Sequence, residues 1–239
     1  MIVDYELDRS VARIYLNRPH RLNAVIPELA SGLVAGFSRA GDDGARVAVL
    51  AGRGRAFCSG YDLKEPPVTD PAAARRQADG IQDVTRAIRR FAGPVVAAVH
   101  GYALGAGCEF ALGCDLVVAA EGTWFGFPEV SVGLSVTGGI SRLLPLLVGP
   151  VLAKELVLLG ERFDAARARQ LGLVNQVCPA GEHERSAAGL AERLRELPPL
   201  ALGLAKQALD RGADCALEEA MAAEADFAAL TMPGRVSND

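Results

Sequence analysis

Three short apolar runs constrain the fold of this chain more than any other feature of its sequence. Residues 47–51, 95–99 and 116–119 are rich in Val and Ala, and each has the length of a strand buried in a sheet. A helical pattern at residues 71–90 separates the first two runs, and a short buried helix separates the second from the third. This alternation predicts β-α-β units and a parallel sheet.

The segments on either side complete the expected order of elements. Residues 3–6 and 11–16 form an expected hairpin, and a helix is expected to begin at Pro27 and run to about Arg39. From about residue 140 the pattern is helical, apart from one strand-like run at 174–177. The helices expected in this part cover residues 150–159, 165–170, 182–196, 199–210 and 216–229.

Composition excludes several classes of protein. The 239 residues carry 25 Lys and Arg against 29 Asp and Glu, a net charge of −4, and half of them are hydrophobic. The chain can therefore bury a large core, and it has no overall field that would attract nucleic acid or an anionic membrane. The apolar stretch at residues 93–120 is interrupted by His100, Glu109 and Asp115, so we do not expect it to span a membrane.

The cysteines indicate a reducing compartment and no metal site. The five of them contain no C-x-x-C pair, and the three histidines add no zinc-ligand spacing. Scattered thiols are typical of reduced cytosolic proteins, and the acidic residues near Met1 do not resemble a signal peptide. We expect a cytoplasmic protein.

Two Gly-rich turns follow two of the expected buried strands. They cover residues 52–65 and 100–109, and neither contains a dinucleotide or nucleotide fingerprint. Either turn alone could be a tight connection. Their pairing, each directly after a buried strand, favours two backbone N–H groups that together form an oxyanion hole.

Two carboxylates near these turns could carry acid–base chemistry. Glu109 lies one turn into a helix that is otherwise apolar, where it is either a salt-bridge partner of an Arg or a general acid or base with a raised pKa. Glu129 follows Pro128 in a loop and could equally be an exposed loop acid.

The remaining candidates have simpler structural interpretations. Ser59 and Ser135 lack a G-x-S-x-G context, which disfavours a serine hydrolase. His100 is expected to pack at a strand end, and Asp115 to cap backbone donors at a turn. The basic pairs Arg75-Arg76 and Arg89-Arg90 are expected on solvated helix faces.

Together these segments resemble the crotonase family, the enoyl-CoA hydratase/isomerase superfamily. The matching stretches follow one another in order and cover nearly the whole chain. They are residues 17–19, 22–24, 55–65, 94–109, 127–130, 138–139 and 172–175.

The resemblance implies an α/β fold, a crotonase-like stack of ββα units with a C-terminal helical trimerisation region. We expect the ββα core to span residues 1–195, and residues 196–239 to form a helical region shorter than that of relatives. The family's usual assembly implies a homotrimer or a dimer of trimers.

The resemblance also implies the site. The backbone N–H groups of Tyr61 and Ala106 would hold the thioester oxygen of an acyl-CoA, and Glu109 and Glu129 match the two acids of the family's hydratases. No metal or other cofactor is expected, because coenzyme A is part of the substrate. The residues expected to contact substrate or CoA are Arg21, Ala24, Ser59, Gly60, Asp62, Leu63 and Gly105.

The activity that the resemblance predicts is an enoyl-CoA hydratase of fatty acid metabolism. Glu129 would supply the α-proton and Glu109 would hold and help deprotonate the water during syn addition to a 2-enoyl-CoA. An enoyl-CoA isomerase, another crotonase-type dehydratase or lyase, and a non-catalytic acyl-CoA-binding subunit remain alternatives. The loop at residues 133–139 departs from the usual hydratase pattern, which predicts a specialised acyl pocket.

Overall fold

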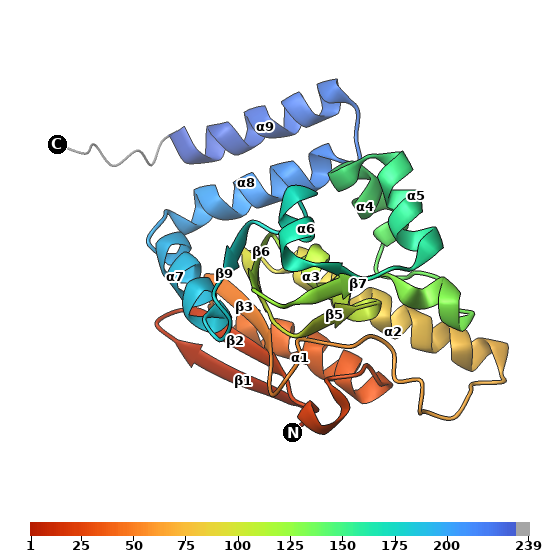
Figure 1. The fold of residues 1–239 in the computed structure, drawn as a ribbon. Helices are drawn as coiled ribbons and strands as arrows, with labels where there is room; N and C mark the ends of the chain where they lie inside the picture. Colours follow the sequence, from red (N-terminus) through yellow and green to blue (C-terminus); the bar gives the residue numbers. More distant parts are fainter. Residues whose placement is uncertain (233–239) are drawn as a thin grey trace.

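A six-stranded sheet forms the centre of the molecule in the computed structural model, which describes residues 1–232 (Figure 1). Its strands lie in the order β1-β2-β3-β4-β6-β9. The first pair is the expected antiparallel hairpin, and every later pair is parallel, as the apolar runs predict. The bounds are β1 Val3–Asp8, β2 Val11–Leu16, β3 Val47–Gly52, β4 Val95–Val99, β6 Leu116–Ala120 and β9 Gln176–Cys178.

A second, three-stranded sheet is built from the chain just beyond two of these strands. The strand β5 (Tyr102–Leu104) follows β4, β7 (Trp124–Gly126) follows β6, and β8 (Phe163–Asp164) completes the sheet. Each β-β step is followed by helical structure, which is the ββα pattern implied by the resemblance. The two sheets and these steps agree with the α/β fold class that the resemblance implies.

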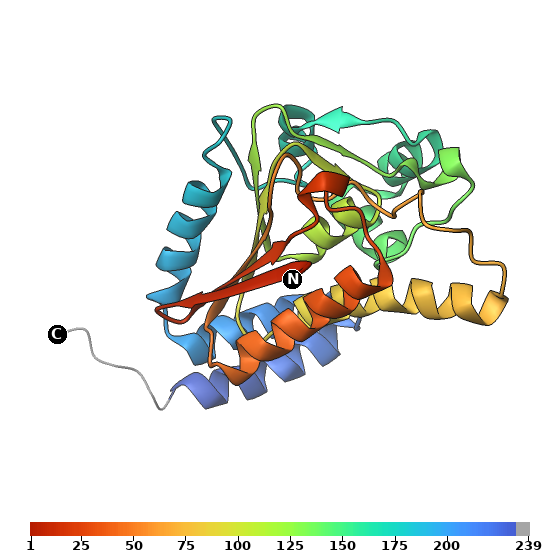
Figure 2. The same cartoon turned by 90° about the horizontal axis from the view of Figure 1, so that it is seen from below.

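Helices cover both faces of the main sheet. The helices α1 (Pro27–Asp42), α2 (Pro71–Arg90) and α3 (Ala106–Gly113) lie on one face, and α7 (His183–Arg195) lies on the other (Figure 2). Successive side chains of a strand point to opposite faces of the sheet. Because helices cover both faces, strand β2 has buried side chains on each of them. Ile14 packs in the core under α1, and its neighbour Tyr15 packs in the second core under α7.

The helical portion stands at one end of the sheet (Figure 1). It contains α4 (Ile140–Val148), α5 (Pro150–Leu159), α6 (Ala165–Gln170), α8 (Pro199–Gly212) and α9 (Leu217–Thr231). Helix α9 packs on α8 and contains no buried residue. The end of the expected C-terminal region, residues 233–239, lies outside the described residues. Within residues 1–232, no helix is long and apolar enough to cross a membrane.

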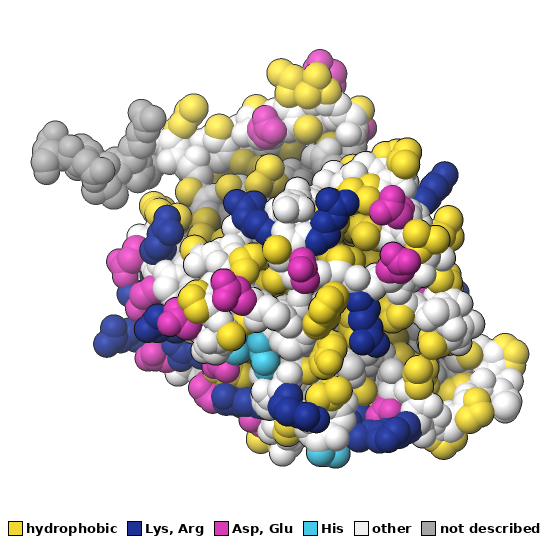
Figure 3. Space-filling model, in the orientation of Figure 1, with side chains coloured by type: hydrophobic (Ala, Val, Ile, Leu, Met, Phe, Trp, Pro, Cys, Tyr) yellow, Lys and Arg dark blue, Asp and Glu magenta, His cyan; other side chains and the backbone are white. Residues whose placement is uncertain are grey.

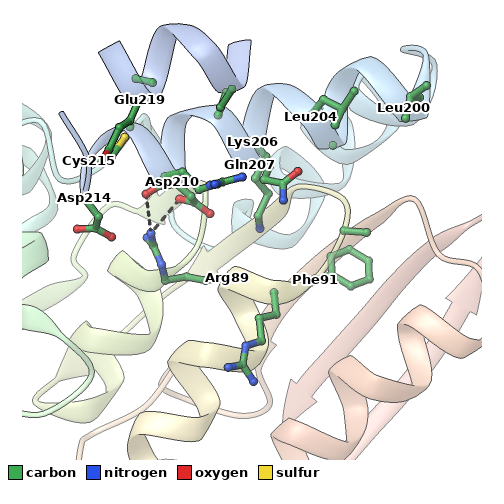
Figure 4. Close-up of a pocket in the computed structure, with 18 of the residues that line it drawn as sticks. Arg89, Phe91, Leu200, Leu204, Lys206, Gln207, Asp210, Asp214, Cys215 and Glu219 are labelled. Carbon is green, nitrogen blue, oxygen red and sulfur yellow. Dashed lines mark hydrogen bonds and ion pairs between the residues drawn. The ribbon is translucent and has the colours of Figure 1, made fainter. Parts of the chain in front are cut away.

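Two ion pairs attach α8 to the core. The buried Lys206 ammonium lies 2.7 Å from a carboxylate oxygen of Asp115, which also accepts the Val95 N–H, so Asp115 does more than cap a turn. Arg89 of α2 lies 3.2 Å from Asp210 of α8, at the edge of a cavity of about 1190 Å³ between α2, α8 and α9 (Figure 4). The prediction that Arg89 lies on a solvated face is therefore wrong, because α8 covers that side of α2.

Two further expectations need correction. The last strand is β9 at Gln176–Cys178, shifted toward the C-terminus from the expected run at 174–177, because Leu173 and Val174 are buried before the strand begins. The strand β8 was not expected at all. This strand has only two residues, which is too short to show a hydrophobic period in the sequence. Its extended conformation comes from its pairing with β7.

Two stacked histidines join α7 to the ends of the parallel strands. The rings of His100, just after β4, and His183, the first residue of α7, lie 4.2 Å apart and nearly parallel. The Nε2 atom of His100 lies 3.0 Å from the Gly54 carbonyl oxygen. Burial, and next the neighbouring His100, lower the pKa of His183, whereas Glu184 opposes this change. A positive charge is also unfavourable at a helix N-terminus.

The lowered pKa of His183 predicts acid sensitivity. The unfolded chain takes up this proton more readily than the folded chain, so the contribution to stability is complete above the ordinary value of 6.5 and is lost as pH falls below it. We expect the free energy of unfolding of His183→Gln, measured in urea, to fall less between about pH 7.5 and about pH 5.5 than that of the native chain. His20→Gln, which alters an exposed histidine, should keep the native dependence. Equal pH dependence in all three proteins would contradict the prediction.

Candidate active site

The structure brings the two Gly-rich turns together at the ends of β3 and β4. The Cys58 N–H donates to the Tyr102 carbonyl at 2.9 Å, and the Leu104 N–H donates to the Cys58 carbonyl at 3.0 Å. These bonds join the first turn to β5 of the small sheet. Neighbouring parallel strands end at the same edge, so two turns that are some 45 residues apart in sequence become neighbours.

The N–H groups of Tyr61 and Ala106 both point away from local partners. Val25 donates to the Gly60 carbonyl at 2.8 Å and accepts from the Asp62 N–H at 3.0 Å, so the N–H of the intervening Tyr61 faces the opposite side. Ala106 is the first residue of α3, where an N–H has no acceptor within the helix. Both residues line one cavity.

This cavity has a volume of about 710 Å³, which is large enough for a substantial acyl group. Its walls come from the first turn, α2, the short helix η2 (Pro128–Val132) and the loop before α4. The larger aliphatic side chains that line it are those of Leu63, Val68, Ile81, Val132 and Leu134. On the α2 side, the Gln77 amide donates to the Tyr61 hydroxyl at 2.9 Å, a contact that sequence analysis did not reveal.

The surroundings of Glu129 favour its protonated form. The residue is 8% exposed, and its Oε2 atom is buried with no hydrogen-bond partner among the described residues. Burial, and secondarily the charge of Glu109, raise the pKa of Glu129 to about 7. The helix start at Gly105 makes room for this carboxyl, because a Cβ on Gly105 would lie 2.7 Å from Oε1 of Glu129, and Gly105 has a φ of +52°.

Glu109 has a different environment although it is more deeply buried. Its side chain has no exposed surface, and its two oxygens accept from the N–H and the hydroxyl of Thr137, both at 2.6 Å. Burial raises the pKa of Glu109, and the two Thr137 bonds counteract part of that increase by stabilising the charged form. Thr137, and no arginine, is therefore its hydrogen-bonding partner within residues 1–232.

Of the residues expected to contact substrate, four line the cavity, namely Ser59, Gly60, Leu63 and Gly105. The buried Asp62 instead lies between two guanidinium groups, 3.0 Å from Arg18 and 2.7 Å from Arg21, which lower its pKa despite burial. Ala24 is buried, and its carbonyl accepts from Arg18. The binding roles of all seven residues stay predictions. Across residues 1–232, no group of three or more His, Cys, Asp or Glu could hold a metal ion.

Comparison with known proteins settles the family. The model of the family described as enoyl-CoA hydratase/isomerase matches residues 6–233. The chain belongs to this family. It is 40% identical to 2,3-dehydroadipyl-CoA hydratase of Escherichia coli K12 over 90% of this chain and 84% of the relative. It is also 33% identical to the short-chain-enoyl-CoA hydratase of Clostridium acetobutylicum over 92% of this chain and 85% of the relative.

Solved structures of family members have the same fold. The enoyl-CoA hydratase from Bacillus anthracis, at 30% identity, superposes with a TM-score of 0.93 over 98% of this chain and 92% of its own. The likeness therefore extends through the helical portion as well as the two sheets.

The geometry at Asp62 leads to a stability prediction. Removing its charge leaves the Arg18 guanidinium buried without a counter-charge, so we expect Asp62→Asn to lower the free energy of unfolding by about 3 kcal/mol. Urea unfolding measures this change. Asp79→Asn, which removes an exposed ion pair with Arg75, should cost less than about 1 kcal/mol. An unchanged stability with weakened CoA binding would instead make Asp62 a ligand contact.

Proposed function

We propose that this family member is an enoyl-CoA hydratase, which adds water in syn fashion to the 2,3-double bond of a 2-enoyl-CoA. The observation that supports this most directly is the unequal environment of its two buried glutamates. Glu129 favours its protonated form, and Glu109 accepts two hydrogen bonds that favour its charged form. Pairs of carboxyl groups that differ in this way are suited to acid and base roles.

Each group has one task in the proposed reaction. The N–H groups of Tyr61 and Ala106 donate to the thioester oxygen, which becomes more negative as water attacks C3. Glu129 delivers its proton to C2, and the proton lost by the water passes to Glu109. One proton thus leaves the pair and one returns to it, so the net charge of the site is unchanged.

The acyl-CoA substrate is supported by the relatives, whose names agree on a CoA thioester and differ in the acyl group. The CoA thioester is therefore the part of the substrate that these relatives have in common. In the proposed enzyme, the side chains of the cavity walls determine which acyl chain fits. The apolar walls suit a hydrocarbon chain, which agrees with the expectation of a role in fatty acid metabolism. The free cysteines of the chain, of which Cys58, Cys108, Cys114 and Cys178 are buried, are compatible with the reducing cytoplasm.

Exposed apolar side chains on the helical portion support assembly as a homotrimer or a dimer of trimers. Hydrophobic side chains lie on the surface over α5 and α9 (Figure 3). Val151, Leu209 and Leu217 are more than two-thirds exposed. An apolar surface of this kind is typical of a subunit contact.

Glutamine variants test the proposal. With crotonyl-CoA, the absorbance of the conjugated thioester should fall rapidly in the native enzyme, and Glu109→Gln and Glu129→Gln should each lower kcat about 10²–10⁴-fold, because each removes an acid–base group. Glu28→Gln, at an exposed helix start, should have no effect. Retention of 3-enoyl-CoA isomerisation by Glu109→Gln, without hydration by the native enzyme, would instead indicate an isomerase.

The pH dependence of hydration tests the assignment of roles. Hydration requires Glu129 to be protonated while Glu109 is charged, and the pKa of Glu129 is about 7. We therefore expect kcat/KM to fall about tenfold per pH unit above about pH 7 and to fall again in acid, when Glu109 takes up a proton. Rates measured from about pH 5 to about pH 9 give this profile, and a constant rate up to the upper limit would refute the assignment.

A further inference from the structure

The proposed base does not reach the substrate cavity itself. Glu109 has no exposed surface and does not line the cavity, whereas Thr137 does. Thr137 also provides both hydrogen bonds to the Glu109 carboxylate. Thr137 therefore lies between the carboxylate and the space in which water and substrate would meet.

The loop around Thr137 is pressed against the carboxylate. A Cβ added to Gly138 would lie 2.8 Å from Cβ of Glu109 and 3.0 Å from its Oε2 atom, and Gly138 has a φ of +57°, which favours glycine. So close a contact leaves no room for a water molecule between the loop backbone and Glu109.

The two bonds from Thr137 differ in what they can transmit. The backbone N–H, 2.6 Å from Oε1, can only donate. The hydroxyl, 2.6 Å from Oε2, donates to the carboxylate and has lone pairs left to accept a hydrogen bond from a water in the cavity. Only the hydroxyl can therefore both lose and receive a proton.

We propose that the Thr137 hydroxyl is a catalytic proton relay, which connects the attacking water to Glu109. This inference rests on the proposed hydratase function and adds to it a residue that is neither of the two glutamates. It also gives a physical role to the loop at residues 133–139, which contains Thr137.

The relay balances as follows. The water oxygen bonds to C3 of the enoyl thioester, and the water proton passes to Oγ of Thr137 as the hydroxyl proton passes to Oε2 of Glu109. Glu129 gives its proton to C2, so the π electrons of the double bond form the C2–H bond. Threonine ends as it began. The pair of glutamates still holds one proton, now on Glu109, and exchange with solvent returns it to Glu129.

A comparison of Thr137→Val with Thr137→Ser tests the relay with crotonyl-CoA as substrate. Valine keeps the shape and the backbone N–H but lacks the hydroxyl, so kcat should fall about 10²–10³-fold while KM changes by less than about threefold. Serine restores the hydroxyl and should recover activity to within about tenfold of the native value. Thr85→Val removes a different buried hydroxyl, on α2, and should leave kcat unchanged.

A double variant separates an effect that acts through Glu109 from an independent structural effect. If the hydroxyl acts only through Glu109, then Thr137→Val should have no further effect on kcat in a Glu109→Gln background. The Glu109→Gln change has already abolished proton transfer to residue 109. Thermal unfolding and the affinity for butyryl-CoA, which cannot be hydrated, establish that each variant folds and binds.

Each result decides the matter. Hydration by native enzyme that is lost in Glu109→Gln but retained in Thr137→Val overturns the relay and leaves the proposed function standing. Additive losses in the double variant also overturn the relay, since they indicate independent structural effects. An absence of hydration by the native enzyme overturns the proposed function and the relay together.

Discussion

The site depends on the hydrogen bonds between Cys58 and the strand β5, which hold two distant turns side by side. A backbone N–H is a useful oxyanion donor only if it has no other acceptor and cannot turn away. The strand-like pairing of Val25 with the first turn directs the Tyr61 N–H, and the start of α3 frees that of Ala106. Two ordinary features of backbone geometry thus produce a pair of directed donors.

The two glutamates show that burial alone does not determine a chemical role. Burial raises the pKa of both, and the deeper of the two, Glu109, is the one that receives hydrogen bonds to its charged form. Glu129 keeps an oxygen without a partner among the described residues. The difference between the two proposed roles, acid and base, therefore comes from where the loop of Thr137 places its hydrogen-bond donors.

The sequence predicts those parts of this molecule whose structure follows from a local pattern. The strands β3, β4 and β6 are recognisable as continuous apolar runs, and the helix at 71–90 by its helical hydrophobic period. The turns around Tyr61 and Ala106 are recognisable by glycine and by resemblance. The partners of individual side chains cannot be recognised in the same way. Nothing in the local sequence indicates that Asp62 pairs with Arg18 or that Thr137 donates to Glu109. Such contacts form only when loops far apart in the sequence are folded together.

The loop that carries Thr137 contacts Glu109 and lines the cavity, whereas the proposed thioester donors, Tyr61 and Ala106, lie on other turns. This division separates two kinds of change during evolution. Under the proposed mechanism, substitutions between residues 131 and 139 can alter how a proton moves or which acyl chain fits, while the two proposed thioester donors stay in place. A single short segment of chain can then change the reaction without disturbing how the thioester is held.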